Sequence, residues 1–475
     1  MTGTWMNTKR NSQIAVFGVL LVAAAWGQDS PTADSQQTPA TPAPAFGQDL
    51  PTPQVTLAPP VTSLDRASLE PTIAPRSFLQ PGLHLTESVN SNLSHNGGSG
   101  SDTIGITRLL GSLDMARIWS RYAFSADYVG GGAFYSDDWG SPSQTHAFSA
   151  GQRYSWRTGQ LQAHDCLTYL PEGSFGFSGF NGAGGGSLVG GLSGCEGFGG
   201  GSSFGSLGNN PRLTNAASVD LRESLSPRSS ITAAGGYTFT DFVHNVDPGT
   251  VNSRQISGQA GYSRVLNHFD QLGLQYSFDE FQFPKLTNGA KQPNTIDSHA
   301  VQVLYEHQVS GRIDLILGVG PQFISETNAA TNVKTTDLTA SAHAILRYKF
   351  PRSSVALSYN RHVTAGSGIQ LGSQTDEARA TFTKPLTRLW TGTADVGYSH
   401  HTALQPPSGN ALGGTYQAGF GGGGLTRRLG RFFSLQMHYQ YTYEYFDSGV
   451  CQQSSCNRNI GDITLSWHPN PIRLD

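Results

Sequence analysis

The stretch that decides the fold lies near the C-terminus and reads FSLQMHYQYTYEYF, residues 433–446. Every second residue in it is apolar or aromatic, and the residues between them are mostly polar. This two-residue period is that of a β-strand, whose side chains point alternately to its two faces. Strands commonly run about five or six residues, so a strand this long, with one apolar and one polar face, needs an unusual environment.

The composition excludes several classes of protein. Charged residues make up 13% of the 475 residues, glycine occurs 58 times, and the formal net charge is −3. A nearly balanced charge argues against nucleic-acid binding. Beyond the N-terminal region, no apolar run reaches the roughly 20 residues that a membrane-spanning helix needs.

The N-terminus has the layout of a secretory signal peptide. Lys9 and Arg10 precede the apolar run IAVFGVLLVAAAW at 14–26, and the small residues Ala25 and Gly27 offer a cleavage site. The alternative is an uncleaved anchor helix, for which the run is short. We expect residues 1–27 to be removed, which takes away two basic residues and changes the net charge from −3 to −5.

Residues 28–80 are a different kind of segment. Proline recurs, aromatic residues are nearly absent, and no period is visible, as in PTADSQQTPATPAPAFGQDLPTPQVTLAPP at 31–60. Such a segment cannot bury enough apolar area to offset its chain entropy. It predicts a disordered periplasmic linker, too short and too rich in proline to be a folded plug domain.

Residues 81–475 repeat the alternation of the opening stretch, and no helical period persists. Tight turns such as SPRS at 226–229 follow every second strand, and longer polar loops such as HNVDPGT at 244–250 follow the others. The pattern predicts eighteen strands, within two. They are placed near 82–92, 104–116, 120–135, 143–156, 159–170, 211–225, 229–243, 251–265, 268–281, 294–308, 312–325, 334–350, 353–364, 374–385, 389–401, 413–428, 431–446 and 457–468.

This architecture resembles the bacterial outer-membrane β-barrels, in particular the porins. Those barrels have an even number of alternating strands, short periplasmic turns and long outer loops. The resemblance implies an all-β fold: a transmembrane antiparallel up-and-down barrel over 81–475, with its apolar face toward lipid and its polar face toward an aqueous lumen. A closed barrel is one of only two ways for a chain to satisfy its backbone hydrogen bonds in lipid.

Tryptophan placement supports a membrane setting. Trp119, Trp156, Trp390 and Trp467 fall at predicted periplasmic strand ends, where aromatic residues gather at membrane interfaces. A soluble propeller would instead show a blade repeat of roughly 40–50 residues. The last predicted strand ends on Trp467, but the segment HPNPIRLD follows it, whereas similar barrels end on a terminal aromatic residue.

Alternation also predicts which charged residues line the pore. They can pair with one another to keep the wall satisfied, or they can set ion selectivity. Both readings stay open. The predicted pore-lining residues are Arg121, Asp127, Arg153, Asp220, Arg222, Glu306, Arg347, Glu377, Arg379 and Asp395.

The third outer loop, residues 172–210, is very rich in glycine and has no basic residue. In general porins a long loop in the corresponding place folds inward and narrows the channel, whereas a flexible surface loop is the alternative. Burial of its phenylalanines in the lumen favours the inward fold. The candidate constriction residues are Phe175, Phe177, Phe180, Phe198 and Phe204.

Four cysteines in an exported chain suggest disulfides. Cys451 and Cys456 lie in one outer loop and are predicted to form a disulfide, whereas pairing of Cys166 with Cys195 stays open. No zinc-ligand spacing is present. The glycines of GFGGGG at 419–424 do not open a helix after a strand, so they do not indicate nucleotide binding.

The most favoured function is a porin-like channel for passive diffusion of small solutes across the bacterial outer membrane. The alternative is a surface-exposed binding or structural barrel with a blocked lumen; a barrel-embedded hydrolase is less favoured, because no G-x-S-x-G or H-E-x-x-H motif occurs. We therefore expect no enzyme activity, no cofactor and no metal. The expected partners are outer-membrane lipid, the barrel-assembly machinery and small solutes, without nucleic acid, and a homo-oligomer is compatible with such a barrel.

Overall fold

The computed structural model describes residues 77–91, 103–136, 143–170, 211–243, 251–284, 294–310, 312–328, 333–366, 370–405, 414–447 and 455–474. They form nineteen strands. The strands are β1 Phe78–Ser91, β2 Thr103–Ile118, β3 Tyr122–Tyr135, β4 Ser143–Ser155, β5 Gly159–Leu170, β6 Arg212–Ser226, β7 Ser229–Phe242, β8 Ser253–Val265, β9 Asp270–Phe283, β10 Asn294–Ser310, β11 Ile313–Asn328, β12 Val333–Phe350, β13 Ser353–Thr364, β14 Ser373–Pro385, β15 Trp390–Ala403, β16 Thr415–Arg428, β17 Phe433–Phe446, β18 Ser455–Trp467 and β19 Ile472–Arg473.

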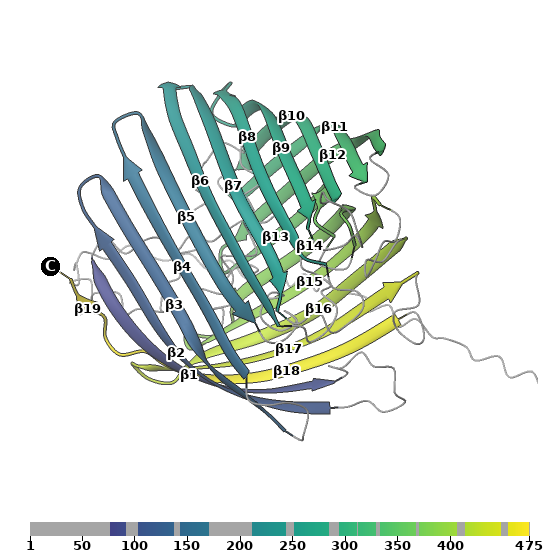
Figure 1. Cartoon of the computed structure of the whole chain (residues 1–475). Helices are drawn as coiled ribbons and strands as arrows, with labels where there is room; N and C mark the ends of the chain where they lie inside the picture. The colour runs from purple at the N-terminus through teal and green to yellow at the C-terminus, as the bar shows by residue number, and fades with distance from the viewer. Residues whose placement is uncertain are drawn as a thin grey trace, which may run out of the picture. The chain divides into compact units, whose positions relative to one another are not determined.

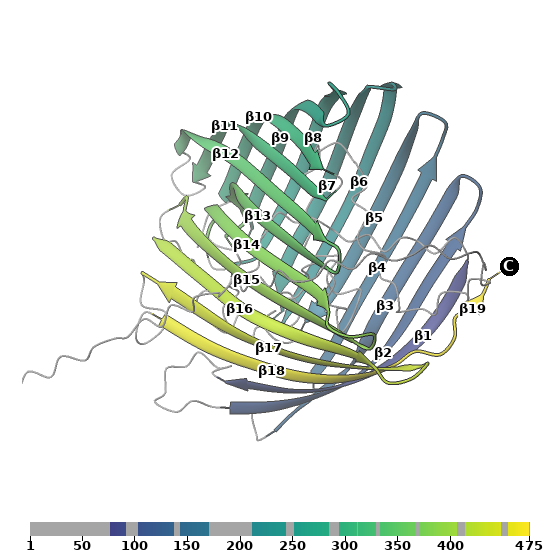
Figure 2. The same ribbon diagram turned by 180° about the vertical axis from the view of Figure 1, so that it is seen from behind.

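The first eighteen strands form a closed antiparallel barrel. Each strand pairs with its neighbours in sequence, and β1 pairs with β18 from Leu83 opposite Trp467 to Asn90 opposite Ile460. Figures 1 and 2 show the strands following one another side by side around the wall. The predicted fold class and the predicted strand number are therefore confirmed.

The two faces of the wall differ as the alternation predicts. On the outer face, Val319, Tyr439 and Leu274 have 60%, 55% and 54% of their surfaces exposed. On the inner face, Thr464 and Gln440 have 0% and 2% exposed. An apolar outer surface of this extent is costly in water and favourable in lipid. The chain is thus a transmembrane β-barrel.

The connections alternate in length, with tight turns at one end of the barrel. The described residues of these turns are 119–121, 156–158, 227–228, 266–269, 312, 351–352, 386–389 and 429–432. Trp119 and Trp156 lie in them, while Trp390 begins β15 and Trp467 ends β18. This is the periplasmic end, since outer-membrane barrels have their short turns there. Across the described ranges, no helix has the length and apolar character to cross a membrane.

The barrel begins earlier than the sequence suggests. β1 starts at Phe78 rather than near residue 81, because residues Phe78–Gly82 pair with Ser112–Ala116 of β2. The remainder of the predicted linker and the signal peptide lie outside the described residues.

The C-terminal segment joins the same seam. Beyond Trp467 the chain continues through residues 468–471, which lie outside any strand, into β19, which pairs with Phe78 and Leu79 of β1. Gln80 donates a side-chain hydrogen bond to the Pro469 carbonyl at 3.1 Å, and the Leu474 amide donates to the Ser77 carbonyl at 3.1 Å. The residues after Trp467 therefore complete the periplasmic edge of the wall between β18 and β1.

Candidate functional site: the inner face of the barrel

Most of the predicted pore-lining residues occupy inner-face positions. Along its strand, each is an even number of residues from side chains that point into the barrel, as Arg153 is from Thr145 and Ser149 on β4. Arg121 is the exception, because it lies in the exposed turn before β3. The residues on inner-face positions are Asp127, Arg153, Asp220, Arg222, Glu306, Arg347, Glu377, Arg379 and Asp395.

An ion pair and a histidine–carboxylate contact lie near each other on the inner face of β14–β18. Arg379 Nε donates to both carboxylate oxygens of Asp395 at 3.1 Å, and its Nη2 makes a third, closer contact. His438 Nδ1 lies 3.0 Å from Asp462 Oδ1. Paired charges are the usual way to keep ionisable side chains in a barrel interior, so structural pairing accounts for Arg379 and Asp395.

The glycine run of β16 separates these two pairs. Gly422 pairs with Asp395 on β15 and with Gln440 on β17, and Gly424 pairs with His438. Because glycine has no side chain, the inner face of β16 leaves room for the longer side chains of β15 and β17.

A second charged feature lies on β2 and β3. Asp114 stands directly opposite Asp127 in the ladder, and both occupy inner-face positions. Like charges placed directly opposite each other are unfavourable. The alternation predicted Asp127 at the pore wall, but the opposing Asp114 was not predicted, because the partner of a residue depends on the register of the two strands.

The inner face of the seam between β18, β1 and β2 is a network of polar side chains. Arg458 Nε donates to Asn90 Oδ1 at 2.7 Å, and Arg108 Nη1 donates to Ser88 Oγ at 2.8 Å. His84 lies between Ser466 and Ser112, with its ring nitrogens 2.9 and 3.0 Å from their hydroxyls. These side chains are almost fully buried.

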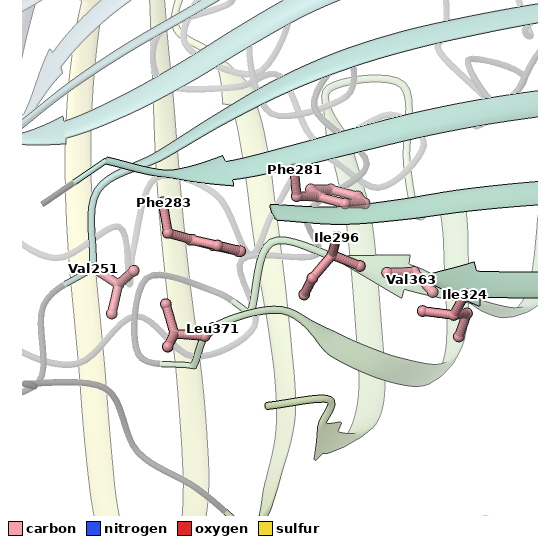
Figure 3. Close-up of a cluster of buried hydrophobic side chains, with 7 residues drawn as sticks. All are labelled: Val251, Phe281, Phe283, Ile296, Ile324, Val363 and Leu371. Atoms are coloured by element: carbon pink, nitrogen blue, oxygen red, sulfur yellow. The ribbon is translucent and has the colours of Figure 1, made fainter. Parts of the chain in front are cut away.

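At the outer end, the described residues between β13 and β14, 365–366 and 370–372, fold into the barrel. Its Leu371 is 1% exposed and belongs to a cluster of seven buried apolar side chains. Figure 3 shows Leu371 beside Val251, Phe283 and Ile296. The remaining members are Phe281, Ile324 and Val363.

This contact spans several strands of the wall. Ile296 lies on β10, which β11 and β12 separate from β13, a distance of roughly 14 Å at the usual strand spacing. On its other side the connection is held by Gln370, whose side chain donates to the Gly414 carbonyl at 3.2 Å, and by Gly372, whose carbonyl accepts from the Leu404 amide at 3.2 Å. Residues 370–372 therefore lie across the inside of the barrel mouth, between β9–β10 and β15–β16.

Two glycines give the backbone of this connection the conformation that the inward path requires. Gly366 and Gly372 have φ of 80° and 71°, a region that favours glycine. A Cβ at Gly372 would meet Ile296 Cδ1, so a larger residue there would have to displace the end of the Ile296 side chain as well as adopt the positive φ. β13 also leaves the wall early, since its last pair with β12 is Arg361 opposite Ala342. This inward path was not predicted from the sequence, in which Gly366 and Gly372 were the available signal.

A serine and a histidine meet near this connection, where neither side chain is accessible to a substrate. His401 Nε2 lies 3.0 Å from Ser399 Oγ, and its Nδ1 lies 2.9 Å from Thr375 Oγ1. A nucleophilic serine needs access to substrate and a group that orients the histidine as a base. Ser399 and His401 are both 0% exposed, and the second imidazole nitrogen faces a hydroxyl rather than a carboxylate.

The glycine-rich loop 172–210 and its five phenylalanines lie outside the described residues, as do the side chains of Cys451 and Cys456. Cys166 is 0% exposed and disulfide-bonded. In the part of the chain that the structure describes, no group of three or more His, Cys, Asp or Glu could hold a metal ion.

Comparison with known proteins gives structural similarity alone. No protein-family model and no curated protein matches the chain. The outer-membrane protein OpdK from Pseudomonas aeruginosa is 10% identical with a TM-score of 0.42, over 82% of this chain and 98% of that chain. OccAB3 from Acinetobacter baumannii is 8% identical with a TM-score of 0.42, over 82% and 99%. The ferric-catecholate import receptor Fiu from E. coli K12 is 8% identical with a TM-score of 0.41, over 82% and 81%.

Similarity at this level does not bear on what the chain transports. The closed barrel does bear on location: its even strand number, short turns at one end and apolar outer face are those of bacterial outer-membrane barrels. The protein is accordingly a barrel of the bacterial outer membrane.

Proposed function

We propose that this protein is a porin-like channel for the passive diffusion of small hydrophilic solutes. The observation that carries the proposal is the polar inner face of a closed eighteen-strand wall, on which serine, threonine, glutamine and charged side chains alternate with the apolar outer positions. A barrel of this strand number has the circumference to enclose an aqueous passage. The inward connection at Leu371 narrows the outer mouth and excludes large solutes.

The charges of the inner face favour cations. Among the described inner positions, acidic side chains outnumber basic ones, and a wall of one excess sign raises the local concentration of the opposite ion. The acidic residues are Asp114, Asp127, Asp220, Asp279, Glu306, Asp314, Glu326, Asp337, Glu377, Asp395, Glu444 and Asp462. The basic residues are Arg108, Arg153, Arg212, Arg222, Arg347, Lys349, Arg379, Arg428 and Arg458.

A barrel with a blocked lumen is the second candidate. It is favoured by the burial of inner-face side chains on β1 and β18, where Thr464 and Asn90 are 0% and 3% exposed. A binding or structural barrel would then present its outer loops to a partner. We propose no catalytic role, because the Ser399–His401 pair is inaccessible.

The two candidates differ in conductance. Purified protein in planar lipid bilayers should show stepwise single-channel currents with a modest preference for cations. Liposomes that contain it should admit small sugars and exclude larger ones. If the protein is folded, as judged by heat-modifiable electrophoretic mobility, but passes neither current nor sugar, the channel function is rejected and the blocked barrel remains.

A further inference from the structure

A polar patch interrupts the lipid-facing side of β4, β5 and β6. Asp165 on β5 is exposed, and Asn215 on β6 donates from Nδ2 to Asp165 Oδ1 and to the Cys166 carbonyl, both at 2.9 Å. Gln152 on β4 is also exposed. These positions alternate with the inner ones and share the outer face with large exposed side chains. The latter are Phe148, Leu161 and Leu167, each 40% exposed.

The register places this patch in the middle of the membrane. On β4 and β5, His146 pairs with Tyr169 toward the outer end, and Tyr154 pairs with Leu161 toward the periplasmic end. Asp165 lies four residues from both Tyr169 and Leu161. At the rise and tilt of barrel strands, four residues correspond to roughly 10 Å along the membrane normal. The carboxyl group therefore lies about midway between the His146–Tyr169 and Tyr154–Leu161 pairs, at the depth of the hydrocarbon.

Lipid cannot satisfy this patch. Hydrocarbon offers no hydrogen-bond donor, and an ionisable side chain at this depth is expensive and usually meets another polar group. These two hydrogen bonds use both hydrogens of the Asn215 amide nitrogen, so that atom cannot also donate to the second carboxyl oxygen of Asp165. The surrounding side chains are small, which lets another wall approach closely. They are Ala126, Ala150, Ala163 and Ala217, all at outer-face positions.

We propose that two copies of this chain pack through the patch, related by a two-fold axis along the membrane normal. Such an axis keeps both barrels in the same orientation and brings the same surface of each copy together. β4 of one copy then faces β5 of the other, and the Gln152 amide of each copy donates to the Asp165 carboxyl group of its partner. The patch holds both the donor and the acceptor that this arrangement needs, and the contact does not depend on whether the lumen conducts.

The oligomeric state tests the contact. The full-length protein in lipid nanodiscs should have the mass of a dimer, and Asp165→Leu or Gln152→Leu should halve that mass. Glu87→Leu is the matched control. Glu87 is another exposed outer-face carboxylate, on β1, where Thr107 Oγ1 donates to it at 2.6 Å, and its loss should leave the dimer intact. Wild-type protein that is monomeric or trimeric in lipid, or an Asp165→Leu dimer, would overturn the proposal.

Barrel stability separates an interface from a structural role. Asp165→Leu makes the lipid face more apolar, so the variant monomer should withstand heating in detergent at least as well as the wild-type monomer. A lower unfolding temperature together with an unchanged oligomer would assign the pair to holding β5 on β6 instead.

Crosslinking in native membranes gives an independent measurement. Ala150 lies next to the proposed axis, opposite Asp165 in the ladder. Ala150→Cys should form a disulfide-linked dimer under mild oxidation in isolated outer membranes. Leu317→Cys, on the outer face of β11, should remain monomeric. Equal crosslinking of the two variants would mean that random collisions, not a defined interface, bring the barrels together.

Discussion

The replacement of Leu371 by alanine tests how the barrel mouth is narrowed. Leu371 is 1% exposed and packs into the seven-residue cluster that joins the β13–β14 connection to β9 and β10. Truncation of a buried leucine to alanine costs about 2–5 kcal/mol. Because the cluster anchors this connection, we expect the cost to appear mainly as weaker anchoring rather than as unfolding of the whole barrel.

The expected change is large enough to measure. At about 1.4 kcal/mol per factor of ten, the population with the connection released should rise roughly 30- to 4,000-fold. Single-channel records of Leu371→Ala in planar bilayers should show a higher mean conductance with more frequent transitions. Liposome swelling should show entry of larger sugars than the wild-type protein admits.

Leu338→Ala is the control, since Leu338 lies on the outer face of β12 with 67% of its surface exposed. It should change neither conductance nor size limit. A correctly folded Leu371→Ala barrel with wild-type conductance and size limit would refute the reasoning. If the wild-type protein itself passes no current, cysteine labelling tests the burial of Leu371 directly: Leu371→Cys should resist a soluble maleimide, whereas Arg121→Cys, in the exposed turn before β3, should react.

Four further outcomes are expected. Deletion of 176–206 from the glycine-rich loop should raise conductance severalfold while the closed sheet keeps its heat stability; unchanged conductance would place that loop outside the passage. Tyr439→Arg, on the lipid face near the middle of β17, should destabilise the barrel by roughly 2–4 kcal/mol, and Gln436→Arg on the inner face should be much milder; equal effects in denaturant titrations would contradict the assignment of the faces. Deletion of 30–75 with the signal peptide kept should leave an assembled, heat-modifiable barrel, because that segment contributes no apolar core; failure to assemble would mean that it is part of the fold. Burial lowers the pKa of the His468 imidazole, which lies beyond the end of β18. Below the ordinary histidine pKa of about 6.5, the unfolded chain therefore binds a proton that the folded chain does not, and the stability of the barrel falls as pH falls. His468→Gln should reduce the loss of thermal stability between about pH 7.5 and 5, and an identical pH profile in the variant would show that the ring does not contribute.

Local pattern determined most of the wall. The side-chain period of a strand is two residues, so alternation in stretches such as 433–446 predicted both the strands and their faces, and the turn signals predicted where the chain reverses. That information is contained within each strand. It was enough to predict the barrel, its strand number and the inner-face position of residues such as Glu306 and Arg379.

Contacts between side chains of different strands were decided only by the tertiary structure. The pairing of Arg379 with Asp395 and the opposition of Asp114 and Asp127 depend on register, which a single strand does not encode. The burial of Leu371 against Ile296 joins residues 75 positions apart in sequence. Such contacts form only after the wall has closed, since closure brings the outer ends of β9, β10 and β13 around one space, and an isolated loop sequence carries no signal of which wall it will meet.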